Sequence, residues 1–163
     1  MQQDTTNPSA IAPSPSEMAP LIRAVGLTKT YGSFTAVHGI CFDVLPGEIF
    51  GLIGPDGAGK TTTFHILGGV MEASGGEIDV LGQAPRKARL ELGYLTQQFS
   101  LYLDLSIDEN LRYSAGLHQV PDAVFHARRE RYLRLMGLDR IGSRLAGQLS
   151  GGMKQKMALC CAL

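Results

Sequence analysis

Eight residues, GPDGAGKT at positions 54–61, constrain this chain more than any other part of it. Their spacing of glycine, lysine and threonine matches G-x-x-x-x-G-K-[ST], the pattern of a phosphate-binding loop. The run stands between an apolar segment, EIFGLI at 48–53, and a helix-like segment at 60–70. A loop between a buried strand and a helix is the context in which this pattern binds phosphate. The sequence therefore predicts an α/β fold with a nucleotide-binding loop.

Each residue type in this loop has a physical reason to be there. Glycines let backbone N–H groups curl around phosphate oxygens, and the helix N-terminus adds partial positive charge. We expect Lys60 to reach the β- and γ-phosphates and Thr61 to offer its hydroxyl to Mg²⁺. A tight glycine turn with an exposed lysine is the alternative, which the flanking strand and helix disfavour. The predicted nucleotide contacts in the loop are Gly54, Pro55, Asp56, Gly57, Ala58, Gly59, Lys60, Thr61 and Thr62.

Length and composition indicate one ordinary globular domain. The chain has 163 residues, of which 44% are hydrophobic and 18% charged, enough apolar material for one core. No apolar stretch approaches the roughly 18 residues of a membrane-spanning helix, and the first twenty residues lack the Lys or Arg of a secretory signal. We therefore expect a cytosolic protein. Residues 7–20 hold four of the eight prolines, which predicts a disordered tail over 1–20.

The apolar pattern predicts several strands. LIRAVGLTKTYG at 21–32 and FTAVHGICFDVLPG at 34–47 are β-branched and aromatic runs around Gly32-Ser33, typical of an antiparallel hairpin. The segments 48–53 and 93–96 are short and apolar, as expected of buried strands, and 77–81 predicts another strand after Gly75-Gly76.

Helix signals dominate after residue 100. Ser106 and Glu109 form an S-x-x-E capping box before a helix with Leu111, Ala115 and Leu117 on or near one face. A second helix starts at Pro121 and stops before Gly137. A last helix is expected to start at Ser150, with its apolar residues near one side: Met153, Met157, Cys160 and Cys161.

Charge is balanced overall but not along the chain. Residues 1–110 carry 6 basic and 12 acidic groups, and residues 111–163 carry 9 and 3. Arginines on one helix are more often a solvated face than a nucleic-acid surface, so no nucleic-acid partner is expected. The three cysteines and four histidines show neither disulfide nor zinc spacing.

Three further segments show a family resemblance. LSGGMKQ at 149–155 resembles the LSGGQ signature of the ATP-binding cassette (ABC) family, and GYLTQQ at 93–98 resembles its Q-loop. We align the Q-loop glutamine with Gln97; Gln98 is the alternative if the alignment shifts. Tyr31, in TKTYG, resembles the aromatic residue that stacks on adenine. A GTPase is disfavoured, since no NKxD motif is present.

The resemblance runs from about residue 21 to 163 and implies a fold. That fold is a P-loop NTPase with an N-terminal antiparallel β subdomain, a central partly parallel sheet and a helical subdomain, about 97–150. It also implies that Gln97 contacts Mg²⁺ and the attacking water. The signature residues would face the ATP of a partner subunit: Leu149, Ser150, Gly151, Gly152 and Gln155.

The same resemblance implies a function and partners. ATP and Mg²⁺ would be the ligands, and a second nucleotide-binding domain and transmembrane permease subunits the partners, at the cytoplasmic face of a membrane. QQFSLYLDLSIDENL, at 97–111, is similar to ABC-2-type multidrug exporters. The alternatives are a nucleotide-binding module without turnover and a soluble ABC ATPase acting on ribosomes or DNA.

Several departures from the family pattern qualify these expectations. The chain ends at Leu163, before the place of the Walker B aspartate, the catalytic glutamate, the D-loop and the switch histidine. Since phosphoryl transfer to water needs a positioned nucleophile, we expect this chain alone not to hydrolyse ATP. Asp56 stands where asparagine is common, and Thr96 where proline is common.

Overall fold

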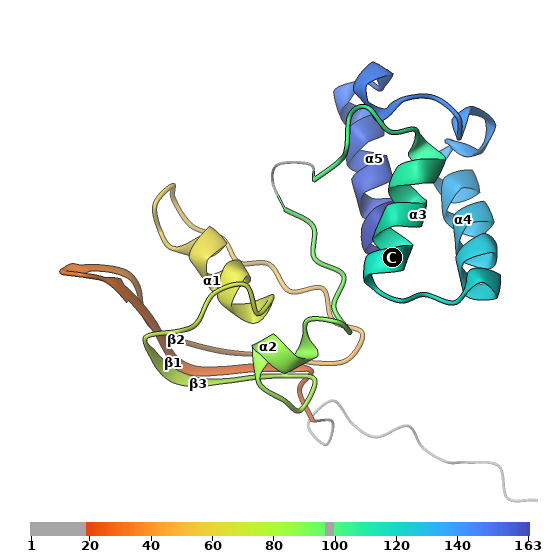
Figure 1. Cartoon of the computed structure of the whole chain (residues 1–163). Helices are drawn as coiled ribbons and strands as arrows, with labels where there is room; N and C mark the ends of the chain where they lie inside the picture. Colours follow the sequence, from red (N-terminus) through yellow and green to blue (C-terminus); the bar gives the residue numbers. More distant parts are fainter. Residues whose placement is uncertain (1–18, 97–99) are drawn as a thin grey trace, which may run out of the picture. The chain divides into compact units, whose positions relative to one another are not determined.

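The computed structural model describes residues 19–96 and 100–163. The chain divides into two compact units, Met1–Arg89 and Leu90–Leu163, each of which has its own secondary structure (Figure 1). Most of the predicted tail, residues 1–18, lies outside the described residues.

The first unit is built on a three-stranded antiparallel sheet. Strand β1 (Ile22–Tyr31) pairs with β2 (Phe34–Val44) across a two-residue turn, which confirms the predicted hairpin. Strand β3 (Gly75–Val80) pairs antiparallel with the other edge of β1, so the order is β2-β1-β3. β3 begins at Gly75 rather than after Gly76, where the sequence predicted a turn.

Helix α1 (Lys60–Leu67) closes the core of this unit. It ends at Gly68, as predicted from the Gly68-Gly69 pair. Its buried Ile66 packs with Ala24 and Leu27 of β1 and Val37 of β2. A short helix, α2 (Pro85–Ala88), follows β3. The helix that starts with the phosphate-loop lysine is thus fixed to the sheet by apolar packing.

Two of the predicted strands are wrong. Residues 48–53 and 93–96 have no strand conformation, and the side chains of Ile49 and Ile53 are 100% and 95% exposed. A strand is stabilised by backbone hydrogen bonds to a neighbour, and within residues 19–96 and 100–163 neither segment pairs with β1, β2 or β3. The expected central, partly parallel sheet is therefore not formed by the described residues. Phe50 stacks on Phe42 of β2, with 5.0 Å between ring centroids.

The second unit is helical. It contains α3 (Ile107–Leu117), α4 (Asp122–Met136) and α5 (Gly151–Ala162), with 3₁₀ turns at Asp139–Ile141 and Ala146–Gln148. Its core consists of Ile107, Leu111, Phe125, Leu133, Leu138, Ala146, Leu149, Met157 and Cys160. Leu117 is exposed, so its predicted place on the apolar face of α3 is wrong; six residues after Leu111, it points to another side of the helix.

The predicted helix boundaries of this unit are confirmed. Ser106 and Glu109 form a complete capping box, whose backbone and side-chain hydrogen bonds lower the pKa of Glu109. Pro121 is the N-cap of α4, and Gly137 ends that helix with φ +68°. Ser150 is the N-cap of α5 and accepts from the Met153 N–H at 3.4 Å.

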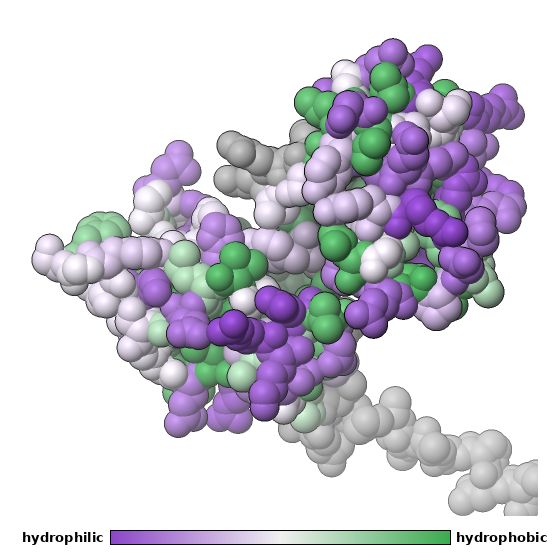
Figure 2. Space-filling model, in the orientation of Figure 1, coloured by the Kyte–Doolittle hydropathy of each residue, from purple (hydrophilic) through white to green (hydrophobic). Residues whose placement is uncertain are grey.

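The surface is mixed in character. Figure 2 shows hydrophilic and hydrophobic residues interspersed over the visible face. Within the part of the chain that the structure describes, no helix is both long and apolar enough to span a bilayer.

A buried amide braces the segment before α3. Asn110 is 3% exposed, and its Nδ2 donates to the carbonyls of Tyr102 (2.9 Å), Leu105 (3.2 Å) and Ser106 (2.9 Å). Its Oδ1 accepts from the Tyr102 N–H at 2.8 Å. The Tyr102 hydroxyl also bonds to that of Tyr113 (3.0 Å), so the segment is tied to α3 at several points.

We predict that Asn110→Ala lowers the free energy of unfolding by about 2 kcal/mol, because it leaves buried backbone groups of the segment unpaired. Urea unfolding of the full chain, followed by circular dichroism, measures this. Arg140→Ala, at an exposed site of the same unit, is the control and should change stability by less than about 0.5 kcal/mol. Equal effects of the two variants would show that the amide network contributes nothing.

Candidate functional site

The phosphate-binding loop is held against the sheet at Gly59. Lys29 pairs with Val37 and Thr30 with Thr35, so Ala36 is an extra residue of β2, a β-bulge. A Cβ on Gly59 would lie 2.2 Å from the Ala36 carbonyl oxygen. Gly59 also has φ +81°, a left-handed conformation that side-chain-bearing residues rarely adopt. Only glycine fits at this point.

The N-terminus of α1 provides backbone donors for an anion. The first N–H groups of a helix have no intrahelical acceptor. Gly59, the N-cap of α1, has no side chain to cap them, and the first turn contains no acidic residue. The Thr63 N–H bonds to the Gly59 carbonyl at 2.8 Å, so the donors before it point toward the loop. Together with the glycine backbone, this end of the helix fits a phosphate group.

Lys60 lies across the loop. Its Nζ donates to the carbonyl oxygens of Gly54 (2.7 Å) and Pro55 (2.6 Å). The ammonium is therefore held beside the backbone of the loop. From there it can exchange its hydrogen bonds to the carbonyls for hydrogen bonds to phosphate oxygens. Thr61, the residue predicted to contact Mg²⁺, is exposed on the first turn of α1.

Tyr31 lies at the end of β1, in the same unit as the loop. Lys29 is paired with Val37, which is buried in the core under α1. Side chains of paired residues, and of residues two apart on a strand, share a face of the sheet. Tyr31 is therefore on the face that carries α1. The structure thus places two predicted parts of the nucleotide site, the loop and the aromatic residue, in the same unit and on the same face of its sheet.

The remaining predicted site residues lie in or near the helical unit. Ser150 caps α5, Leu149 is buried in the core, and Gly151 and Gly152 are exposed with nothing within 4 Å of an added Cβ. Gln155 is exposed on α5. The predicted Q-loop glutamine, Gln97, and its alternative, Gln98, lie outside the described residues.

Sequence reasoning missed some residues of this site. The bulge at Ala36 follows from strand register, which no local motif marks. Lys29 and Met71 contact Tyr31, yet they have no motif of their own. The period-2 pattern of β1 was the one signal available for Lys29, since it places residues 29 and 31 on one face.

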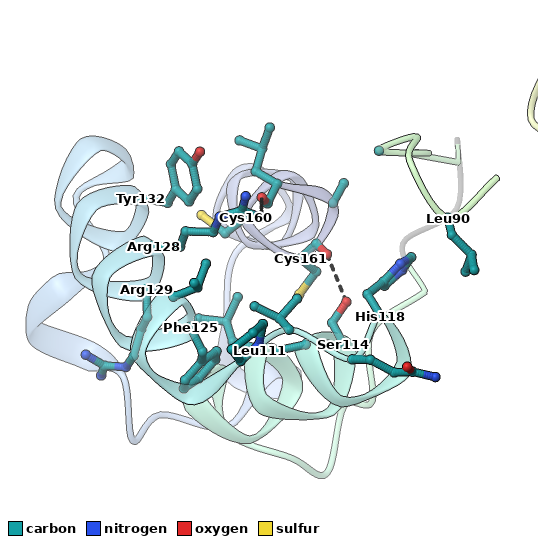
Figure 3. Close-up of a pocket in the computed structure, with 18 of the residues that line it drawn as sticks. Leu90, Leu111, Ser114, His118, Phe125, Arg128, Arg129, Tyr132, Cys160 and Cys161 are labelled. Atoms are coloured by element: carbon teal, nitrogen blue, oxygen red, sulfur yellow. Dashed lines mark hydrogen bonds between the residues drawn. The ribbon is translucent and has the colours of Figure 1, made fainter. Parts of the chain in front are cut away.

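The helical unit contains a separate cavity of about 680 Å³ (Figure 3). It is lined by α3, α4, α5 and residues 90–93, and by none of the residues predicted to bind nucleotide. Burial raises the pKa of the Cys161 thiol to about 12 and also raises that of Cys160, so both stay protonated near neutral pH. The Ser114 hydroxyl donates to the Cys161 carbonyl at 2.8 Å.

Comparison with known proteins shows the family to which the chain belongs. A family model described as ABC transporter matches residues 37–163. The chain is 40% identical over 147 residues to the probable multidrug ABC transporter ATP-binding protein YbhF of Escherichia coli, and 34% identical over 140 residues to the sulfate/thiosulfate import ATP-binding protein CysA of Gloeobacter violaceus. A solved structure of an ATP-binding subunit of an ABC transporter superposes with a TM-score of 0.79 at 32% identity.

These relatives are longer than the region they share with this chain. The matches cover 88% of the chain but 25% of YbhF, and 84% of the chain but 41% of CysA. The superposition covers 86% of this chain and 60% of the solved one. The fold class expected from the sequence, that of an ABC nucleotide-binding domain, is confirmed by these neighbours.

We predict that Gly59→Ala is much more damaging than Gly57→Ala. Both glycines have φ +81°, so each alanine costs about 1 kcal/mol of backbone strain. At Gly57 the added methyl meets nothing within 4 Å, whereas at Gly59 it collides with the Ala36 carbonyl, which adds about 1–3 kcal/mol. Urea unfolding of both variants without nucleotide measures the difference. Equal losses of stability in the two variants would contradict the close approach of Gly59 to the Ala36 carbonyl.

Proposed function

Because the chain belongs to the ABC transporter family, we propose that it is the ATP-binding part of a transporter and couples ATP binding and hydrolysis to the movement of a small molecule across a membrane. The observation that carries this proposal is the loop at Gly59, where a helix N-terminus without a side-chain cap lies beside the Lys60 ammonium.

Phosphate recognition would proceed from the geometry of this loop. The backbone N–H groups at the start of α1 would donate to the β-phosphate, and the Lys60 ammonium would leave the carbonyls of Gly54 and Pro55 for the β- and γ-phosphates. The ammonium is already within the loop, so this requires rotation of one side chain rather than refolding. The residue contacts proposed here are Gly54, Pro55, Asp56, Gly57, Ala58, Gly59, Lys60, Thr61 and Thr62.

The base would bind to Tyr31, in the same unit as the loop. Tyr31 lies on the sheet face that carries α1 and is 46% exposed, which leaves ring surface for stacking. Stacking of a base on an aromatic side chain is worth about 1–3 kcal/mol in nucleic-acid binders. A nucleotide with its phosphates on the loop and its adenine on Tyr31 would be held by one unit.

Hydrolysis would need further groups. Mg²⁺ would neutralise charge on the phosphates, with the Thr61 hydroxyl and Gln97 as its proposed protein ligands. Gln97 would also orient the attacking water. The N-terminus of α5, capped by Ser150, would face the nucleotide of a second domain of the same kind, with Gly151, Gly152 and Gln155 around it. Leu149, buried in the core, would support this helix end from within.

Partners and location follow from the same proposal. Transmembrane permease subunits would be bound at the cytoplasmic face of the membrane, where this part of the protein is peripheral. The 40% identity to a probable multidrug ABC transporter ATP-binding protein supports a small molecule as the cargo and export as the proposed direction.

We predict that Lys60→Ala weakens ATP binding ten- to hundred-fold, because hydrogen bonds from an ammonium to phosphate are charge-assisted. Isothermal titration of the full chain with Mg-ATP gives the dissociation constant. Lys87→Ala, at an exposed lysine of α2, makes the same change in net charge and should leave the affinity within about two-fold. Tight ATP binding by the Lys60 variant would exclude this loop as the phosphate site.

A further inference from the structure

Tyr31 is held by two residues that no motif includes. The Lys29 ammonium lies 5.3 Å from the centroid of the Tyr31 ring, over one of its faces. The Tyr31 hydroxyl donates to Met71 Sδ at 3.0 Å. The ring is thus contacted on one face and at its hydroxyl end, while 46% of the residue remains exposed.

Both contacts are anchored to the chain that follows α1. Lys29 Nζ donates to the Glu72 carbonyl at 2.7 Å. The Thr30 N–H donates to Ser74 Oγ at 3.0 Å, and the Ser74 N–H donates to the Thr28 carbonyl at 2.8 Å. Residues 71–74 therefore tie the last residues of β1 to the end of the helix that begins with the phosphate-binding loop.

Building on the nucleotide site proposed above, we propose that Lys29 and Met71 are positioning residues for the base. Lys29 covers one face of the Tyr31 ring and Met71 fixes its hydroxyl, so that the opposite face is presented to a purine base whose phosphates lie on the loop. Neither residue touches the nucleotide itself. They act through the orientation of Tyr31.

The physical basis of this inference is preorganisation. A surface aromatic ring that must be ordered on binding costs affinity, since the side chain loses conformational entropy when it is immobilised. A cation over the ring and an acceptor for its hydroxyl fix the ring beforehand. Methionine sulfur is a weak acceptor, so we expect Lys29 to contribute more than Met71.

The experiment compares a ligand that has a base with one that has none. The probes are Mg-ATP and Mg-tripolyphosphate, titrated calorimetrically into the full chain. Lys29→Met keeps the aliphatic stem and removes the ammonium; it should weaken ATP binding about three- to five-fold and leave tripolyphosphate binding within 1.5-fold. Lys29→Arg should restore ATP affinity, and Met71→Leu, which keeps the volume, should weaken it about two-fold.

Two controls separate positioning from structure and from charge. In a Tyr31→Ala background, Lys29→Met should have no further effect on ATP affinity, because the residue through which it acts is gone. Arg23→Met removes the same charge near the other end of β1, about 20 Å along the strand from Lys29, and should change neither affinity.

Three results would overturn the inference. They are an equal loss of ATP and tripolyphosphate binding in Lys29→Met, a loss that persists in the Tyr31→Ala background, and unchanged ATP affinity in both Lys29→Met and Met71→Leu. Failure of the unaltered chain to bind either probe would instead contradict the proposed nucleotide site, and the inference with it.

Discussion

The close approach of Gly59 to the Ala36 carbonyl is the contact on which the proposed nucleotide site depends. The Ala36 carbonyl of the bulge in β2 lies directly against Gly59. The space is sufficient only because Gly59 has no Cβ and adopts a left-handed conformation. The contact sets the first turn of α1 directly on the sheet, while Ile66 secures the other end of the helix in the core. The donors of the helix N-terminus are thereby fixed in position before any ligand binds.

The same unit also holds Tyr31, the proposed contact of the base, in a fixed position. Residues 71–74, which follow α1, form hydrogen bonds with the last residues of β1. The helix that begins at the loop is therefore connected to the strand that ends at Tyr31. The helical unit has its own core and its own braced segment, in which Asn110 fixes the chain that leads into α3. In the proposed transporter, the first unit would hold a nucleotide and the second would present Ser150 to the nucleotide of a partner.

Local sequence patterns were sufficient to predict those features that depend on a few neighbouring residues. The phosphate-binding loop, the β1–β2 hairpin and the caps at Ser106, Pro121 and Ser150 were all predicted, because each depends on a few neighbouring residues. The strands expected at 48–53 and 93–96 were wrong, since an apolar run becomes a strand only when another strand pairs with it. The bulge at Ala36 and the contacts of Tyr31 depend on register and on residues 40 positions apart, which no local pattern encodes.

Hydrogen–deuterium exchange of the full chain, measured by mass spectrometry, tests the central claim most directly: one unit holds both ends of a nucleotide. Mg-ATP should slow exchange of the amides in 54–63 and also in 28–34, whereas Mg-tripolyphosphate should slow exchange in 54–63 alone. Slower exchange of 28–34 with tripolyphosphate as well would show that this segment responds to phosphate and not to the base. Unchanged exchange in 54–63 with either ligand would contradict the claim that this loop binds the phosphates.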